Sequence, residues 1–148
     1  MSTYTQIIYH IVFSTKNREP VLIKENREQL FRYIWGFIKQ HNHYLYRING
    51  VEDHLHILMN LHPSTALADF IRQLKLTTSN WIKANKIFPK FTYWQEGYGA
   101  FTHSILEKDP LMEYIKNQEE HHKKVSFQEE LRKLLTEARI EFDERYFK

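Results

Sequence analysis

Two histidines separated by one residue are the first feature of this sequence that could bind a metal ion. His54 and His56 lie in a segment of mostly apolar residues. Because alternate side chains of a strand point to the same face, both imidazoles would lie on one face and could hold one divalent cation. The opposite, apolar face would consist of Leu55, Ile57, Met59 and Leu61. The alternative is a pair of ordinary surface histidines, and the spacing alone does not distinguish the two.

A second pair with the same spacing is formed by His41 and His43. These residues lie between a predicted helix and a predicted strand. Neither the helical period nor the two-residue period of a strand therefore defines the directions of their side chains. We expect this pair to be solvated at the surface.

A tyrosine and a glutamine four residues apart form the other candidate group. Tyr114 and Gln118 would share one face of a helix predicted over residues 109 to about 124, with His121 and His122 one turn further on. The alternative is that Tyr114 is an apolar-face residue of an amphipathic helix and Gln118 is solvated. The sequence contains no glycine-rich phosphate loop, no G-x-S-x-G motif and no carboxylate triplet with nuclease spacing.

The elements that would position these groups follow from the pattern of apolar residues. The segment Tyr4–Ser14 is rich in β-branched and aromatic residues, which predicts a strand buried largely on both faces. Apolar residues then recur at helical spacing from about Glu25 to His41 and predict a helix. Asn49 and Gly50, between two apolar segments, predict a type I′ turn that joins the two strands of a hairpin.

A second helix is predicted to begin at Pro63 and Ser64. Its buried face would consist of Leu67, Phe70, Ile71, Leu74, Thr78, Trp81 and Ile82. Its more exposed positions include the basic residues Arg72, Lys75, Lys83 and Lys86. Aromatic residues alternate over residues 91–104 and predict a fourth strand, in which Gly97 and Gly99 indicate a bulge or a close backbone approach.

Two further helices are predicted at the end of the sequence. Asp109 as N-cap and Pro110 at the first helical position would begin one, and Ser126 with Glu129 forms a capping box for the other. The apolar face of the last helix would consist of Leu131, Leu134, Leu135 and Ala138. The order of elements predicts an α+β fold, in which helices pack on an antiparallel sheet in a ferredoxin-like split βαβ arrangement with additional C-terminal helices.

Length and composition exclude several classes of protein. The 148 residues, 42% hydrophobic and 26% charged, are those of one ordinary globular domain without a signal peptide or an apolar span, and we expect a cytoplasmic protein that does not enter a membrane. With no cysteine, disulfides, thiolate metal sites and a cysteine nucleophile are excluded. The net charge of +3 is compatible with an anionic partner but does not require one.

Four segments together resemble one family. They are the opening YHIVFSTKNREPVL, then GVEDHLHILM, then WQEGYGAFTHS, then YIKNQEEHH. Their content and order resemble the single-tyrosine HUH transposases, small enzymes of insertion sequences that move as single-stranded DNA. The resemblance covers nearly the whole chain and implies a single HUH transposase domain over residues 1–148, whose C-terminal helices, from about residue 109, carry the nucleophile and a terminal packing helix. The run Glu119–His122 departs from the family by being acidic and rich in histidine, and we assign it no role.

The resemblance implies specific roles for four residues. His54 and His56 would bind the metal, Gln118 would supply a third ligand and Tyr114 would be the nucleophile. The enzyme would cleave and rejoin single-stranded DNA at insertion-sequence ends through a covalent 5′-phosphotyrosine, which conserves the energy of the cut bond for religation. Two imidazoles and an amide oxygen, without a thiolate, suit Mg²⁺ or Mn²⁺.

The expected partners are single-stranded DNA with a hairpin near the element end and, from the resemblance, a second copy of the chain in a homodimer. Candidate DNA contacts are Lys16, Arg18, Arg47, Arg72, Lys75 and Lys83. Two other functions remain open: a domesticated, non-catalytic module that binds single-stranded nucleic acid, and a nickase resembling replication initiators or relaxases. A purely binding module would not require all four of the site residues, and the chain is short for a replication initiator.

Overall fold

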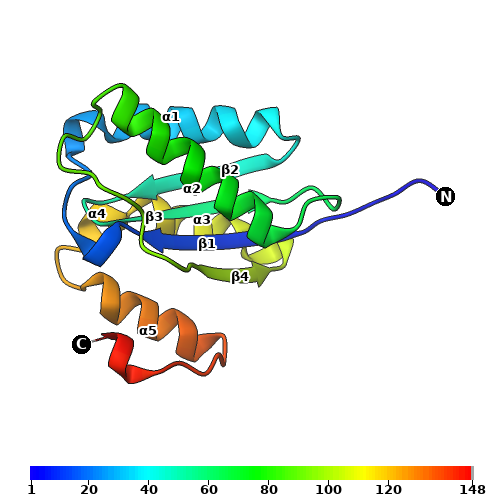
Figure 1. Cartoon of the computed structure of the whole chain (residues 1–148). Helices are drawn as coiled ribbons and strands as arrows, with labels where there is room; N and C mark the ends of the chain where they lie inside the picture. Colours follow the sequence, from blue (N-terminus) through cyan, green and yellow to red (C-terminus); the bar gives the residue numbers. More distant parts are fainter. Residues whose placement is uncertain (148) are drawn as a thin grey trace.

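The computed structural model describes residues 1–147 and contains a four-stranded antiparallel sheet (Figure 1). The strands are β1 (Ile8–Ser14), β2 (Tyr44–Gly50), β3 (His54–Asn60) and β4 (Gly99–His103). They lie in the order β2-β3-β1-β4. Because β3 separates β1 from β2, and β1 separates β3 from β4, both helical crossovers skip one strand. This topology is the predicted split βαβ arrangement.

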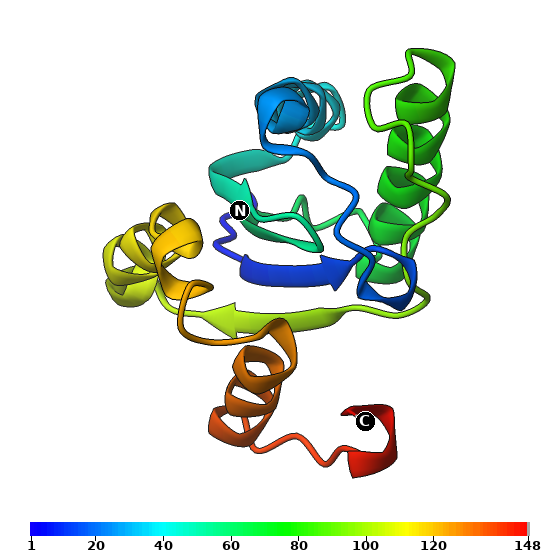
Figure 2. The same ribbon diagram turned by 90° about the vertical axis from the view of Figure 1, so that its left-hand side faces the viewer.

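Helices cover the sheet on both faces. They are α1 (Lys24–Gln40), α2 (Leu67–Ala84), α3 (Lys108–Lys116), α4 (Gln118–His121) and α5 (Phe127–Glu137). Figure 2 shows α1 and α2 together on one side of the sheet, with α3 and α4 on the other side and α5 below β4. The fold is therefore α+β, as predicted.

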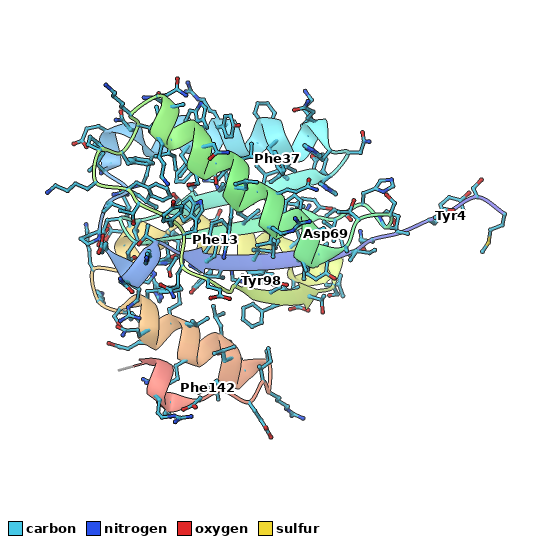
Figure 3. The ribbon with its side chains drawn as sticks, in the orientation of Figure 1. Tyr4, Phe13, Phe37, Asp69, Tyr98 and Phe142 are labelled. Atoms are coloured by element: carbon cyan, nitrogen blue, oxygen red, sulfur yellow. The ribbon has the colours of Figure 1, made fainter. Side chains whose placement is uncertain are left out.

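The larger part of the core lies between the sheet and the first two helices. Leu55, Ile57 and Met59 of β3 join one buried cluster with residues of α1 and α2. Phe13, labelled in Figure 3, leaves β1 on the same side and contacts Trp94. The alternation predicted for β3 is thus observed, since one of its faces is entirely apolar.

The opposite face of the sheet has two smaller apolar clusters with histidines between them. Ile8 and Leu58 pack against Ile115 of α3, whereas Val12 and Phe101 pack against Phe127 at the start of α5. These two clusters hold α3 and α5 in place on either side of the imidazoles.

Several strand boundaries differ from the predicted ones. The strand β1 begins at Ile8, and residues 1–6 form an exposed N-terminal extension rather than part of the sheet (Figure 1). The region predicted as a fourth strand over residues 91–104 contains only the short β4, preceded by a loop in which Gly97 has a φ of 89°.

The hairpin is confirmed, but its turn is not at Asn49 and Gly50. Both residues are paired within the sheet, opposite His56 and Leu55, and neither has the positive φ that a type I′ turn requires. The chain reverses after them, where the Val51 N–H donates to the His54 carbonyl at 3.1 Å. A Cβ atom at Gly50 would lie 2.5 Å from the carbonyl oxygen of His54, so this glycine is needed for a close approach of two strands.

Three helix boundaries also differ. The second helix begins at Leu67, so Pro63 and Ser64 belong to the preceding loop. The helix predicted from Asp109 has Glu107 as its N-cap, which places Asp109 and Pro110 inside the first turn. It also ends at Lys116, and Asn117 separates it from the single turn of α4.

The last helix agrees with the prediction at its start. The Ser126 hydroxyl accepts a hydrogen bond from the Glu129 N–H at 3.2 Å, as a capping residue does. Leu131, Leu134 and Leu135 pack against the cluster around Phe101, whereas Ala138 is exposed and caps the C-terminal end. Within residues 1–147, no helix has the length and hydrophobicity to cross a membrane.

Candidate active site

The two histidines of β3 lie on the same face of the sheet and are completely buried. Their ring centroids are 5.1 Å apart. The alternative that His54 and His56 are ordinary surface histidines is therefore wrong, because α3, α4 and α5 cover that face of the sheet.

Each of the two imidazoles has a partner on its Nδ1 atom. His54 Nδ1 lies 2.7 Å from a carboxylate oxygen of Asp53, and His56 Nδ1 lies 2.8 Å from Nε2 of His10 on the neighbouring strand. Such outer contacts fix the ring orientation and the tautomer of metal-binding histidines. As a result, both Nε2 atoms point to the same region under α5.

Tyr114 and Gln118 reach this region from two helices rather than from one. Tyr114 lies on α3 and Gln118 on α4, after the interruption at Asn117. The two side chains nevertheless converge, because both donate hydrogen bonds to the same oxygen, Oε2 of Glu130. The expectation that these two residues lie together is confirmed, although a continuous helix is not the reason.

Glu130 of α5 stands at the centre of the cluster and is 2% exposed. Its Oε1 lies 2.8 Å from Nε2 of His56, 3.1 Å from Nε2 of His122 and 3.3 Å from Nε2 of His54. The ligand atoms of His54, His56, His122 and Glu130 all lie within 4.8 Å of one another. These four residues could hold one metal ion.

The acidic and histidine-rich run divides into two pairs. His121 and His122 face Glu130, with Nε2 of His121 at 3.2 Å from Oε2. Glu119 instead forms ion pairs with Lys24 and Arg27 of α1, and Glu120 pairs with Lys123 at the surface. Only the histidine half of this run belongs to the site.

Burial and charge shift the pKa values of the clustered groups in different directions. Burial lowers the pKa of His56 to about 4 and that of His10 to about 3. Burial would also lower the pKa of His54, but the neighbouring carboxylates of Asp53 and Glu130 outweigh it and raise the value. Burial alone would raise the pKa of Glu130, but the surrounding imidazoles hold this pKa far below its ordinary range.

Four buried atoms of the site residues lack a hydrogen-bond partner within residues 1–147: Nδ1 of His10, Nε2 of His54, Oε1 of Gln118 and Nε2 of His121. Those of His54 and Gln118 belong to residues expected to bind the metal, and both residues are fully buried. A lone pair on each would be satisfied by a cation in the centre of the cluster. The donor set of imidazole nitrogens, an amide oxygen and a carboxylate therefore fits a divalent metal ion.

Four of the six basic residues proposed to contact DNA lie in or beside one groove, and a fifth lines a second hollow. Lys16, Arg72 and Lys75 line a groove beside α2, and the ammonium of Lys83 lies 3.6 Å from the ring centroid of the exposed Tyr93 in the same groove. Arg18 lines a second hollow that also contains His122.

Lys75 and Arg47 differ from the other four residues in their contacts or their position. Lys75 is not simply exposed, since its ammonium donates to the carbonyls of Gln95 and Gly97, and burial lowers its pKa to about 8. Arg47 lies apart from the other five, in a hollow between β2 and α1.

The second histidine pair differs from its prediction in one residue. His41 is exposed, but His43 is 7% exposed, and its Nδ1 accepts a hydrogen bond from the His62 N–H at 2.9 Å. The aromatic ring of Phe70 packs against it. His43, which lies between α1 and β2 in the sequence, thus packs against α2 and the loop that follows β3, and it lies outside the candidate site.

The sequence analysis did not identify Glu130 and His10 as site residues, although each is a polar residue within an apolar pattern. Glu130 occurs at the same helical spacing as Phe127, Leu131 and Leu134, so a carboxylate lies on the apolar face of α5. His10 similarly interrupts an apolar strand. Since a buried charge is rare without a partner, either position could have been recognised as a candidate for the site.

A strand-borne histidine pair that faces a helix-borne tyrosine, on a sheet of this topology, is the arrangement of the single-tyrosine HUH transposases. Residues 3–118 match the family model described as "Transposase IS200 like". The chain belongs to this family of transposases.

One curated relative and two solved structures show the similarity in sequence and in fold. The ISDra2 transposase TnpA of Deinococcus radiodurans is 24% identical over 118 residues, which cover 76% of this chain and 84% of that protein. A solved structure of a putative transposase from the same organism has a TM-score of 0.62 at 24% identity and covers 80% of this chain and 95% of that one. A REP-associated tyrosine transposase bound to a REP hairpin has a TM-score of 0.61 at 16% identity, with 84% of this chain and 76% of that chain covered.

Proposed function

We propose that this transposase cleaves and rejoins single-stranded DNA with Tyr114 as the nucleophile and a divalent metal ion held by His54, His56 and Gln118. The observation that supports this function is the convergence of the Tyr114 hydroxyl and the two Nε2 atoms on one buried carboxylate. A scissile phosphate that binds at this place would contact the metal and the nucleophile together.

The metal would be Mg²⁺ or Mn²⁺, and it would neutralise negative charge that develops on the phosphate during attack. The residues around it have separate tasks. Asp53 and His10 orient the two imidazoles, while Gln118 brings its amide oxygen to the same centre. The Tyr114 oxygen would attack phosphorus and form the phosphotyrosine bond, while the bond from phosphorus to the 3′ oxygen breaks. The phenol would lose its proton and the leaving 3′ oxygen would gain one, which gives a free 3′ hydroxyl on the other strand end.

The DNA would run along the groove beside α2 and the hollow that contains Arg18. The groove beside α2 contains the exposed rings of Tyr93 and Tyr98, on which unpaired bases could stack. Figure 3 labels Tyr98 in the loop that leads into β4. The turn at Lys16–Arg18 connects this groove with the hollow that reaches His122, so a single strand could pass from one to the other. Arg47 would be a separate contact in the hollow between β2 and α1.

Four further properties are part of the proposal. A hairpin near the element end is the expected DNA feature, since the REP-associated relative was solved with a hairpin. A homodimer and a cytoplasmic location are also proposed, as is a single domain over residues 1–148. Sedimentation at micromolar concentration tests the dimer, and a monomer that is fully active in cleavage would refute it.

The decisive experiment incubates the protein with Mn²⁺ and single-stranded DNA from the genomic flanks of its own gene. We expect a covalent protein–DNA adduct that maps to Tyr114 by mass spectrometry. An adduct on another tyrosine, such as Tyr98, would refute the mechanism. Binding of the same DNA without an adduct would favour a non-catalytic module.

A further inference from the structure

The helix α5 lies outside the part of the chain that matches the family model, yet it contributes the central residue of the site. The match ends at residue 118, whereas Glu130 is twelve positions further on. His122 also lies beyond the match. The family assignment therefore gives no role to either residue, and we infer their roles from their distances to the other site residues.

The distances around Glu130 are those between ligands of one metal ion. Ligand atoms that are each about 2.0–2.2 Å from an ion lie roughly 2.8–3.6 Å from one another in octahedral or tetrahedral geometry. The Oε1 atom of Glu130 lies 2.8, 3.1 and 3.3 Å from the Nε2 atoms of His56, His122 and His54. Since a carboxylate oxygen offers about two lone pairs, three nitrogens around it exceed what hydrogen bonding alone requires.

The tautomers of two of these histidines support the same interpretation. Nδ1 of His54 faces the Asp53 carboxylate at 2.7 Å, and Nδ1 of His122 faces the Val125 carbonyl at 2.7 Å. Both partners only accept hydrogen bonds, so both Nδ1 atoms carry protons. With Nδ1 protonated, each Nε2 can face the Glu130 carboxylate either through a second proton on the ring or through a metal cation that takes the place of that proton.

We propose that α5 completes the metal centre: Glu130 Oε1 and His122 Nε2 bind the divalent ion together with His54 and His56, while Glu130 Oε2 positions Tyr114 and Gln118. This inference deepens the proposed function and depends on the same metal site. One carboxylate thereby links the ion to the nucleophile. An ion with six coordination positions still has room for a phosphate oxygen.

The test measures metal binding by the full chain without DNA. Mn²⁺ is the probe, since its binding can be followed by titration calorimetry and its nitrogen ligands by pulsed electron paramagnetic resonance. We expect Glu130→Gln to weaken Mn²⁺ binding by roughly tenfold or more, and Glu130→Asp to recover part of the affinity. His122→Ala should remove one of the imidazole nitrogen couplings that the wild type shows.

The matched control is Glu137→Gln, which makes the same change at an exposed position of the same helix. Thermal unfolding in chelator checks that each variant is folded. If a folded Glu130→Gln protein binds Mn²⁺ as tightly as the wild type, or if the wild type binds none, the inference is wrong.

The two proposals can fail separately. A wild type that binds Mn²⁺ through Glu130 but forms no DNA adduct would refute the proposed cleavage and keep the metal centre. If the wild type forms the Tyr114 adduct while Glu130→Gln retains full Mn²⁺ affinity, the proposed cleavage is kept and the role of Glu130 in the metal centre is refuted.

Discussion

The hydroxyl of Tyr114 donates a hydrogen bond to the carboxylate of Glu130, which lies 16 residues further along the chain. Burial and the neighbouring carboxylate together raise the pKa of the tyrosine well above its ordinary value. In this state the phenol is protonated and held in one orientation. A divalent cation at the same place would act in the opposite direction and favour the phenolate.

The first prediction concerns the nucleophile. Tyr114→Phe removes one oxygen from a half-buried ring that contacts His10 and His56. We expect loss of detectable strand cleavage, with Mn²⁺ affinity and single-stranded DNA affinity within about twofold of the wild type, because the ring and the metal ligands remain. A gel assay for cleavage and a binding titration measure the two effects. Cleavage by the variant would contradict the assignment.

The second prediction concerns the histidine pair. His56→Ala should weaken Mn²⁺ binding by roughly tenfold or more, because it removes a buried imidazole and its orienting contact with His10. Calorimetric titration gives the affinity. The exposed His62 provides the control, and His62→Ala should bind as the wild type does. Equal affinity of His56→Ala and the wild type would exclude His56 as a ligand.

The third prediction concerns the DNA groove. Binding of single-stranded DNA should weaken about tenfold or more between 50 and 200 mM salt, since a few phosphates are neutralised. Lys16→Ala combined with Lys83→Ala should weaken binding and reduce the slope of affinity against salt by roughly 1 to 2. The control is Lys133→Ala, an exposed lysine on α5. A double variant with an unchanged salt slope would place the DNA elsewhere.

The fourth prediction concerns a buried hydrogen bond that holds the groove in shape. The indole N–H of Trp94 donates to the Thr78 hydroxyl at 2.9 Å, and both side chains are buried. Thr78→Val keeps the shape but leaves that N–H unpaired, which should lower the free energy of unfolding by about 1–3 kcal/mol. Urea denaturation measures the change. The same replacement at Thr77, which is only partly buried, should cost clearly less.

The fifth prediction concerns pH. Burial lowers the pKa of His43, helped by the nearby His41 and His62. Because the folded pKa lies below that of the unfolded chain, the unfolded state binds more protons on acidification, and stability present above about pH 6.5 is lost as the pH falls. His43→Asn keeps an acceptor for the His62 N–H and removes the titration. Its unfolding free energy should fall less steeply between pH 7 and 5 than that of the wild type, and equal slopes would contradict the prediction.

The sequence predicted the sheet and its helices because their apolar periods are strong. It placed His54 and His56 on one face since strand periodicity defines that face whatever covers it. It did not predict the break at Asn117, because Tyr114 and Gln118 have helical spacing on either side and only tertiary contacts decide where a helix is interrupted. The turn was misplaced because Gly50 is required for a close strand contact, which local turn preferences do not describe.

The centre of the site could not be predicted in the same way. Glu130 meets His56 across 74 residues of sequence, and no local pattern indicates which strand the carboxylate of α5 will face. The four family segments end before it. The histidine run 121–122 was visible, but its relation to Glu130 depends on how the chain turns between α4 and α5.

The long separation between His56 and Glu130 has a consequence for how the protein is made. During synthesis the N-terminal part of a chain leaves the ribosome first. A nascent chain can therefore expose β1, β2 and β3 while α5 is still untranslated, and at that stage the Nε2 atoms of its histidine pair do not yet face the Glu130 carboxylate. Contacts between distant segments also form slowly during folding. The centre is assembled only after residue 130 has emerged, so a stalled or truncated translation product would carry the histidines and the tyrosine without the group that joins them.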